Sequence, residues 1–186
     1  MDVSEAIFAR RSVRSFKPRP VARDMIETLI AAAIEAPSAM NEQPWIFSVI
    51  ETPAVLDRIS TAAKALMLSL QPAESASPLR GMLSDPGFHI FYHAPVLIVI
   101  SAKGGGNWAV EDCALAGQNL MLTAYDAGLG SCWIGFAQAW LGTAEGRALL
   151  GLSANDRPVA PIIVGYPMGS VEAPSRRPAD IRWIEA

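Results

Sequence analysis

The residues best suited to chemistry form an arginine-rich segment near the N-terminus. It reads Arg10-Arg11-Ser12-Val13-Arg14-Ser15-Phe16, and a second basic pair, Arg176-Arg177, stands near the C-terminus. Guanidinium is a planar fork that can bind a phosphate or a carboxylate through two hydrogen bonds, each contributing about 1.5–3 kcal/mol. The mixture of guanidinium and hydroxyl groups predicts a monophosphate site. Taken alone, it is also compatible with a solvated charged turn.

The glycine-rich stretches do not match the common nucleotide-binding loops. Gly128-Leu129-Gly130 begins a G-x-G pattern, but Trp133 stands where the third glycine of G-x-G-x-x-G is needed. The stretch also follows an expected helix rather than a strand, which excludes the Rossmann fingerprint. Gly104-Gly105-Gly106 lacks the Gly-Lys-Ser/Thr of a phosphate loop and is interpreted as a hinge.

Side chains for nucleophilic or metal-assisted catalysis are equally sparse. His89 and His93 are four residues apart, but they belong to no H-E-x-x-H motif and precede an expected strand, so no metal is expected. Cys132 is followed by Trp133 and Ile134, surroundings typical of an inert buried thiol. The sequence contains no G-x-S-x-G motif of a serine hydrolase. We therefore expect a bound cofactor to carry the chemistry.

Composition limits the class of protein further. Of 186 residues 51% are hydrophobic, and the formal net charge is −3, which argues against a broad basic nucleic-acid surface. The apolar run at 94–100 is far shorter than the roughly 20 residues of a membrane helix. The first residues carry no signal-peptide pattern. We expect one domain over 1–186 and a cytoplasmic location.

Periodicity and breaker residues predict the elements that position these groups. Helices are expected over 2–10, 20–36, 53–70, 108–127 and 143–150, and strands over 45–50, 96–100, 132–134, 160–164 and 181–184. The stretch 71–87 shows no sustained period and is expected to be a loop that serves as a substrate lid. The close approach of another segment is expected at Gly117, in the middle of the longest helix.

The order of these elements favours an α+β domain with a mixed sheet, because helices and strands do not alternate regularly. Three features predict a homodimer: the high share of apolar residues, the isolated strand-like end 181–184, and the apolar surface of the helix over 108–127, which includes Leu115, Ala116 and Leu122. A monomer is the alternative.

Three segments together resemble the nitroreductase family of flavoproteins: the arginine-rich segment, the loop from Pro37 to Trp45, and the stretch Gly128-Leu129-Gly130-Ser131-Cys132-Trp133-Ile134-Gly135. They stand in the order and spacing of that family, and the resemblance covers nearly the whole chain. It implies a mainly antiparallel mixed sheet flanked by helices, in an intertwined homodimer. It also implies two FMN sites at the subunit interface and NADH or NADPH as reductant.

The resemblance carries over to particular positions. Arg10, Ser12 and Arg14 would hold the ribityl phosphate and the pyrimidine edge, with Arg11 close by, and Arg176 or Arg177 would close on the phosphate. The flavin would be lined by the other subunit's loop, and a backbone N–H would lie near N5. The loop positions are Pro37, Ser38, Ala39, Asn41 and Gln43, and the residues beside the isoalloxazine are Trp133, Ile134 and Gly135. No residue acts as nucleophile or general acid, and Arg14 and Gly135 give electrostatic support.

The resemblance implies that the protein is an FMN-dependent oxidoreductase. It would pass hydride from NADH or NADPH to nitroaromatic, quinone or related electrophilic small molecules by a ping-pong mechanism. Alternatives within the family are reduction of an activated double bond, dehalogenation and oxygen-dependent flavin chemistry. A protein that binds flavin without turnover is an alternative of another class.

Overall fold

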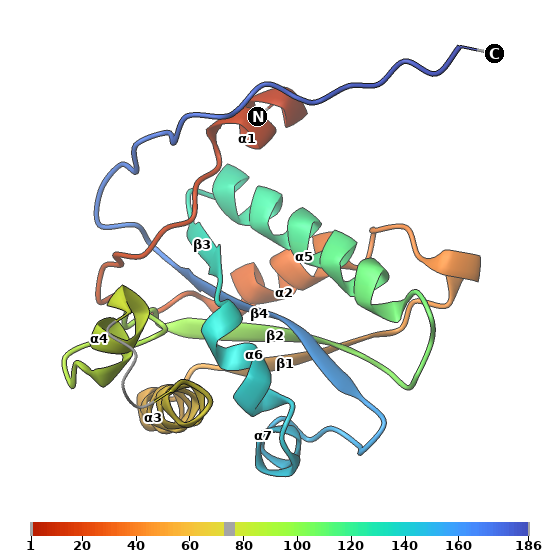
Figure 1. Cartoon of the computed structure of the whole chain (residues 1–186). Helices are drawn as coiled ribbons and strands as arrows, with labels where there is room; N and C mark the ends of the chain where they lie inside the picture. The colour runs from red at the N-terminus through yellow and green to blue at the C-terminus, as the bar shows by residue number, and fades with distance from the viewer. Residues whose placement is uncertain (1, 73–76, 186) are drawn as a thin grey trace.

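A four-stranded antiparallel sheet organises the chain in the computed structural model, which describes residues 2–72 and 77–185. The strands are β1 (Trp45–Ile50), β2 (Val96–Ala102), β3 (Gly130–Trp133) and β4 (Arg157–Gly165). They are ordered β1-β2-β4-β3, and each neighbouring pair is antiparallel. Figure 1 shows helices on both faces of this sheet, which confirms the expected α+β class.

The helices form two layers that sandwich the sheet. Their bounds are α1 (Val3–Ala9), α2 (Arg23–Ala33), η1 (Ala39–Asn41), α3 (Pro53–Ser69), α4 (Pro78–Ser84), α5 (Ala109–Asp126), α6 (Gly135–Leu141) and α7 (Ala144–Leu149). Helices α2 and α5 share one buried cluster with the sheet, whereas α3 and α6 share a second one (Figure 1). Among the residues described, no helix is long and apolar enough to cross a membrane.

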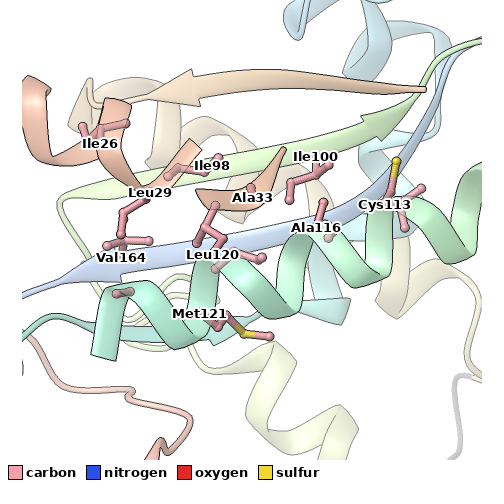
Figure 2. Close-up of a cluster of buried hydrophobic side chains, with 14 of the residues drawn as sticks. Ile26, Leu29, Ala33, Ile98, Ile100, Cys113, Ala116, Leu120, Met121 and Val164 are labelled. Atoms are coloured by element: carbon pink, nitrogen blue, oxygen red, sulfur yellow. The ribbon is translucent and has the colours of Figure 1, made fainter. Parts of the chain in front are cut away.

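Strand β2 separates the two cores because its side chains alternate between the faces of the sheet. Ile98 and Ile100 join the cluster under α2 and α5, which Figure 2 shows, whereas Leu97 and Val99 join the cluster under α3 and α6. Every residue of β2 is buried. A strand covered on both faces needs apolar residues on both, and this explains the continuous apolar run in its sequence.

Helix α5 lies directly on the sheet, and Gly117 permits the close approach. A Cβ atom at Gly117 would lie 3.3 Å from Ile162 Cδ1 and 3.6 Å from the Cβ of Ala160, both on β4. The side chains of Cys113, Ala116 and Leu120 on the same helix are fully buried (Figure 2). Ala116 therefore belongs to the core and not to the free apolar surface expected for this helix, whereas Leu115 is exposed. The close approach expected from an isolated mid-helix glycine is therefore present.

Three sequence expectations need correction. The stretch 71–87 is not a continuous loop, because α4 begins there at Pro78 and the Ser77 side chain caps it by accepting a hydrogen bond from the Arg80 N–H. Residues 73–76 of that stretch lie outside the described part. Helix α6, which follows β3 directly, was not expected. The end 181–184 forms no strand within this chain and is exposed.

The segment after α1 is held against the edge of β3. The Val13 N–H donates to the Ser131 carbonyl (3.0 Å), and Ser12 forms a parallel bridge with Ser131. The Val13 side chain is buried over Gly130, where an added Cβ would lie 2.7 Å from the Val13 Cβ. Gly130 therefore sets how closely the arginine-rich segment approaches the sheet.

We expect Gly130→Ala to lower the free energy of unfolding by about 1–3 kcal/mol, because the β-branched Val13 cannot yield without moving its backbone. Chemical denaturation followed by circular dichroism measures this change. Gly81→Ala on α4 is the control, since its Cβ would meet nothing within 4 Å. Equal stability of Gly130→Ala and the wild type would contradict the role assigned to this contact.

Candidate functional site

The arginine-rich segment presents its polar side chains away from the core. Val13 and Phe16 are buried, whereas Ser12 is half-buried and Arg14 is exposed. Phe16 also bridges Pro167, so the start of the C-terminal tail runs beside the same segment. Two buried apolar side chains thus anchor the segment, and its hydroxyl and guanidinium groups stay available to a ligand.

Four residues expected to bind the phosphate line one cavity of about 360 Å³, namely Arg10, Arg11, Ser12 and Arg14, and Arg176 lines it as well. In Figure 1 the C-terminal tail passes α1 before it runs beyond the body of the chain, which explains how a residue so distant in sequence reaches this place. Glu172 contributes a carboxylate to the same wall.

The electrostatics of this cavity favour an anion. Burial lowers the pKa of Arg10, and the positive charges of Arg11 and Arg176 lower it further. A guanidinium whose pKa is lowered by its neighbours lies in a positive potential, and a bound phosphate would offset that repulsion. The cavity can therefore hold a phosphate group.

Arg11 has a second task in the fold. Its Nη1 donates to the carbonyls of Phe8 (2.7 Å) and Arg10 (2.8 Å), which satisfies the C-terminal end of α1. Its Nε is buried and has no hydrogen-bond partner among the described residues; the same holds for the Oγ of Ser131. Both residues line an adjoining cavity of about 280 Å³. Ser131 was not expected from the sequence, where a strand serine gives no signal.

Arg176 and Arg177 differ in position. Arg176 faces the Arg10 cavity, whereas Arg177 is an exposed tail residue and does not line it. The structure thus brings together the arginine-rich segment and one of the two C-terminal arginines. Which of the two reaches a phosphate could not be decided from their adjacent positions in the sequence.

The loop after α2 has an unusual backbone. Met40, Asn41 and Gln43 have φ values of 51°, 56° and 49°, in the left-handed region that non-glycine residues seldom adopt. Ser38 Oγ accepts a hydrogen bond from the Gln43 N–H (3.0 Å), and the Gln43 side chain donates to Asn41 Oδ1 (3.1 Å). Pro37 stands at the start of this loop and is exposed.

This loop and the arginine cavity lie at opposite ends of α5. Ala39 contacts Asp112 in the first turn of the helix, and Tyr125 in its last turn lines the cavity beside Arg11. At a rise of about 1.5 Å per residue, the step of 13 residues from Asp112 to Tyr125 spans about 20 Å. Figure 1 shows η1 near one end of α5 and α1 near the other. One chain therefore does not bring the two predicted parts of the site together.

The three residues at the end of β3 have different surroundings. Trp133 is half-buried and packs against α5, and Ile134 is buried with its N–H donating to the Pro161 carbonyl (2.7 Å). Gly135 begins α6, and a Cβ there would meet nothing within 4 Å. The first N–H groups of a helix have no partner within the helix, so the Gly135 N–H is a candidate backbone donor to a ligand.

Tyr92 and Asp112 were not expected from the sequence to be site residues. The Tyr92 ring lies 6.0 Å from the Arg14 guanidinium carbon. Asp112 is 4% exposed on the buried side of α5. An acidic residue within the apolar stripe of a helix is the signal that could have identified Asp112. Lys64 donates to the carbonyls of Asp85 and Phe88.

The histidine pair shows no metal-binding geometry. The rings of His89 and His93 lie 4.6 Å apart, and His89 Nε2 is 3.2 Å from Asp57 Oδ1. Burial lowers the pKa of His89, and the charge of His93 adds to this shift. In the part of the chain that the structure describes, no group of three His, Cys, Asp or Glu side chains could hold a metal ion.

Comparison with known proteins identifies relatives along most of the chain. A protein of Methanothermobacter thermautotrophicus named NADH dehydrogenase/NAD(P)H nitroreductase is 31% identical over 172 residues, 90% of this chain and 78% of that protein. A CLA biosynthesis enone reductase of Lactiplantibacillus plantarum is 34% identical over 92 residues, 49% of this chain and 42% of that protein. The crystal structure of a nitroreductase with bound FMN from Bacteroides fragilis is 28% identical, with a TM-score of 0.84 over 100% of both chains.

The family-level match agrees with these relatives. The pattern of the Nitroreductase family matches residues 7–166. This span contains the arginine-rich segment, the loop after α2 and the end of β3, and it stops short of Arg176. The chain belongs to the Nitroreductase family.

Proposed function

We propose that this protein is an FMN-dependent oxidoreductase that uses NADH or NADPH to reduce electrophilic small molecules, with nitroaromatics and quinones as the first candidates. The observation that carries the proposal is the convergence of Arg10, Ser12, Arg14 and Arg176 on one positive cavity. The Bacteroides fragilis relative, whose structure contains FMN, has the same fold over its whole length. The protein works as one domain over residues 1–186 in the cytoplasm.

The residues present fit the phosphate of FMN. A phosphate dianion needs several donors, and the cavity offers guanidiniums from two distant parts of the chain. The unpartnered Arg11 Nε and Ser131 Oγ are further donors, buried beside it. Arg10, Ser12 and Arg176 would hold the phosphate, and Arg11 would support them while it caps α1.

Two groups would adjust the reactivity of the flavin. Bound FMN would supply hydride transfer from the nicotinamide to the acceptor, in a ping-pong order in which the oxidised nicotinamide leaves before the acceptor binds. Arg14 would hold a positive charge near the pyrimidine edge and so stabilise the negative charge of the reduced cofactor. Gly135 would offer its N–H near N5, and the open space beside it allows close approach.

The second half of the site would come from a partner subunit. The loop residues Pro37, Ser38, Ala39, Asn41 and Gln43 lie at the opposite end of α5 from the arginine residues within one chain, so they would line the flavin of the other subunit. Exposed apolar side chains supply an interface: Ile7 and Phe8 on α1, and Ile181, Trp183 and Ile184 on the tail. Trp133 and Ile134 would back the isoalloxazine from within the subunit that holds the phosphate.

Reduction of an activated double bond is the second candidate reaction. The enone reductase relative shares 34% identity over about half of this chain, and that observation favours an ene-reductase among the other flavin reactions of the family. Dehalogenation and oxygen-dependent chemistry have no comparable support. A flavin-binding protein without turnover is distinguished by the first experiment below.

We expect the purified protein to be yellow and its bound flavin to lose absorbance near 450 nm when NADH or NADPH is added under anaerobic conditions. Rapid mixing with each nicotinamide, followed by a nitroaromatic, a quinone and an enone, identifies the reductant and the acceptor class. Parallel lines in double-reciprocal plots would support the ping-pong order. Flavin that stays oxidised with both nicotinamides would contradict the enzymatic role.

Arg14→Ala should lower both the flavin occupancy and the midpoint potential, because the reduced cofactor loses a nearby positive charge. The potential is measured by anaerobic titration against a reference dye. Arg23→Ala is the matched control, since Arg23 is an exposed arginine on α2 that pairs only with Glu27 in the described part of the chain. An Arg14→Ala variant with unchanged potential and occupancy would remove Arg14 from the site.

Light scattering should give a mass twice that of the 19.9 kDa chain. Co-expression of Arg10→Ala with Asn41→Ala tests whether each site uses both subunits. A mixed dimer then contains one intact site, so native flavin affinity should return in a fraction of the sites, although each variant alone binds weakly. A monomer at micromolar concentration, or no recovery in the mixed dimers, would contradict the shared site.

A further inference from the structure

A buried carboxylate links α5 to the loop that precedes β1. Asp112 is 4% exposed, and its Oδ1 accepts a hydrogen bond from the Ala39 N–H (3.1 Å), 73 residues away in the sequence. Its Oδ2 is buried and has no hydrogen-bond partner among the described residues. Burial, together with the charge of Asp112, raises the pKa of the neighbouring Cys113 to about 12. Asp112 is therefore almost closed off from solvent, beside a buried thiol.

The hydrogen bond from the Ala39 N–H to Asp112 attaches to α5 a loop, residues 38–43, that has further hydrogen bonds of its own. The Ala39 carbonyl accepts from the Glu42 N–H (3.0 Å), and Ser38 receives the N–H groups of Asn41 and Gln43 through its carbonyl and its hydroxyl. The side chains of Met40, Asn41 and Gln43 are exposed. Few buried side chains thus restrain this loop. Its left-handed backbone is held by hydrogen bonds to Ser38 and Ala39, and the Ala39 N–H in turn attaches these residues to Asp112 on α5.

A buried carboxylate that accepts a hydrogen bond from only one N–H is energetically unfavourable for the fold alone. Burial of a charged group is unfavourable unless hydrogen bonds compensate, and one oxygen of Asp112 has none here. The N–H groups of Asn41, Glu42 and Gln43 bond only within the loop, and the exposed side chains of the loop gain no packing from its shape within this chain. The arrangement is understandable if the shape of the loop itself serves a ligand.

We propose that Asp112 is a positioning residue, which fixes the Ala39 N–H and thereby holds residues 38–43 in the shape that contacts the flavin of the partner subunit. The inference rests on the proposed function for its flavin part. It adds a residue that touches neither the cofactor nor the substrate, and that acts through the loop.

Three variants test this role. Asp112→Ala removes the acceptor, and Asp112→Asn keeps an acceptor oxygen at nearly the same place. Ala39→Pro removes the donor instead: Ala39 is the first residue of η1, where proline is tolerated, and Ser38 has the extended backbone (φ −135°, ψ 149°) that a residue before proline needs. Glu111→Ala is the control, because it removes an exposed carboxylate from the adjacent position of α5.

Amide hydrogen exchange on the flavin-free protein gives the first readout. In Asp112→Ala the amides of residues 39–43 should exchange faster while those of α5 stay protected, and Asp112→Asn and Glu111→Ala should resemble the wild type. Unchanged exchange in the loop would overturn the proposal. Should Asp112→Ala fail to fold, Ala39→Pro carries the same test through Asn41, Glu42 and Gln43.

The affinity for FMN and the visible flavin spectrum give the second readout. If Asp112 only stabilised the fold, a variant with an unchanged melting temperature would keep the wild-type affinity and spectrum. We expect Asp112→Ala and Ala39→Pro each to raise the Kd for FMN about ten-fold and to shift the visible flavin spectrum, and the double variant to add little to either. Equal Kd values in Asp112→Ala and the wild type would overturn the flavin part. A wild-type protein that takes up no FMN would instead refute the proposed function, whereas the exchange experiment would still decide the role of Asp112 in the loop.

Discussion

The attachment of residues 12–16 to the edge of β3 is the contact on which the candidate site depends. Val13 is buried over Gly130, and the pleat then directs Ser12 and Arg14 away from the core. The bridge from Phe16 to Pro167 aligns the start of the C-terminal tail with the same segment. Guanidiniums from both ends of the chain are thereby held close to one another, and their mutual repulsion is offset when an anion binds between them.

Helix α5 imposes the second constraint. The first turn of this helix binds the loop after α2 through Asp112, and its last turn lines the cavity beside Arg11 through Tyr125. A helix of this length keeps the two predicted halves of a flavin site apart within one chain, and the proposed dimer would unite them. The apolar side chains left exposed on α1 and on the tail agree with such a pairing. Asp112 contributes to this arrangement, because its hydrogen bond to Ala39 attaches the loop to α5.

Most elements could be predicted from the sequence because their signals are local. Strand β2 is a continuous apolar run, and α2, α3 and α5 carry stripes at helical period. Helices α4 and α6 were missed: each is only seven residues long, α4 lies within the proline- and glycine-containing stretch 71–87, and α6 follows β3 without a break. The end 181–184 has the pattern of a strand, but a strand needs a neighbour to accept its hydrogen bonds, and this chain supplies none in the described region.

By itself the sequence determined the chemistry of the site: a guanidinium-rich segment suited to phosphate, a polar loop before β1, and a glycine at the end of β3. Only the tertiary structure decided which of these groups meet. It placed Arg176 rather than Arg177 in the cavity, engaged the Arg11 head group with the end of α1, and left open space beside Gly135 at the start of α6. The physical reason is that residue type and local period are properties of short segments, whereas convergence depends on how segments more than 100 residues apart pack on a common sheet.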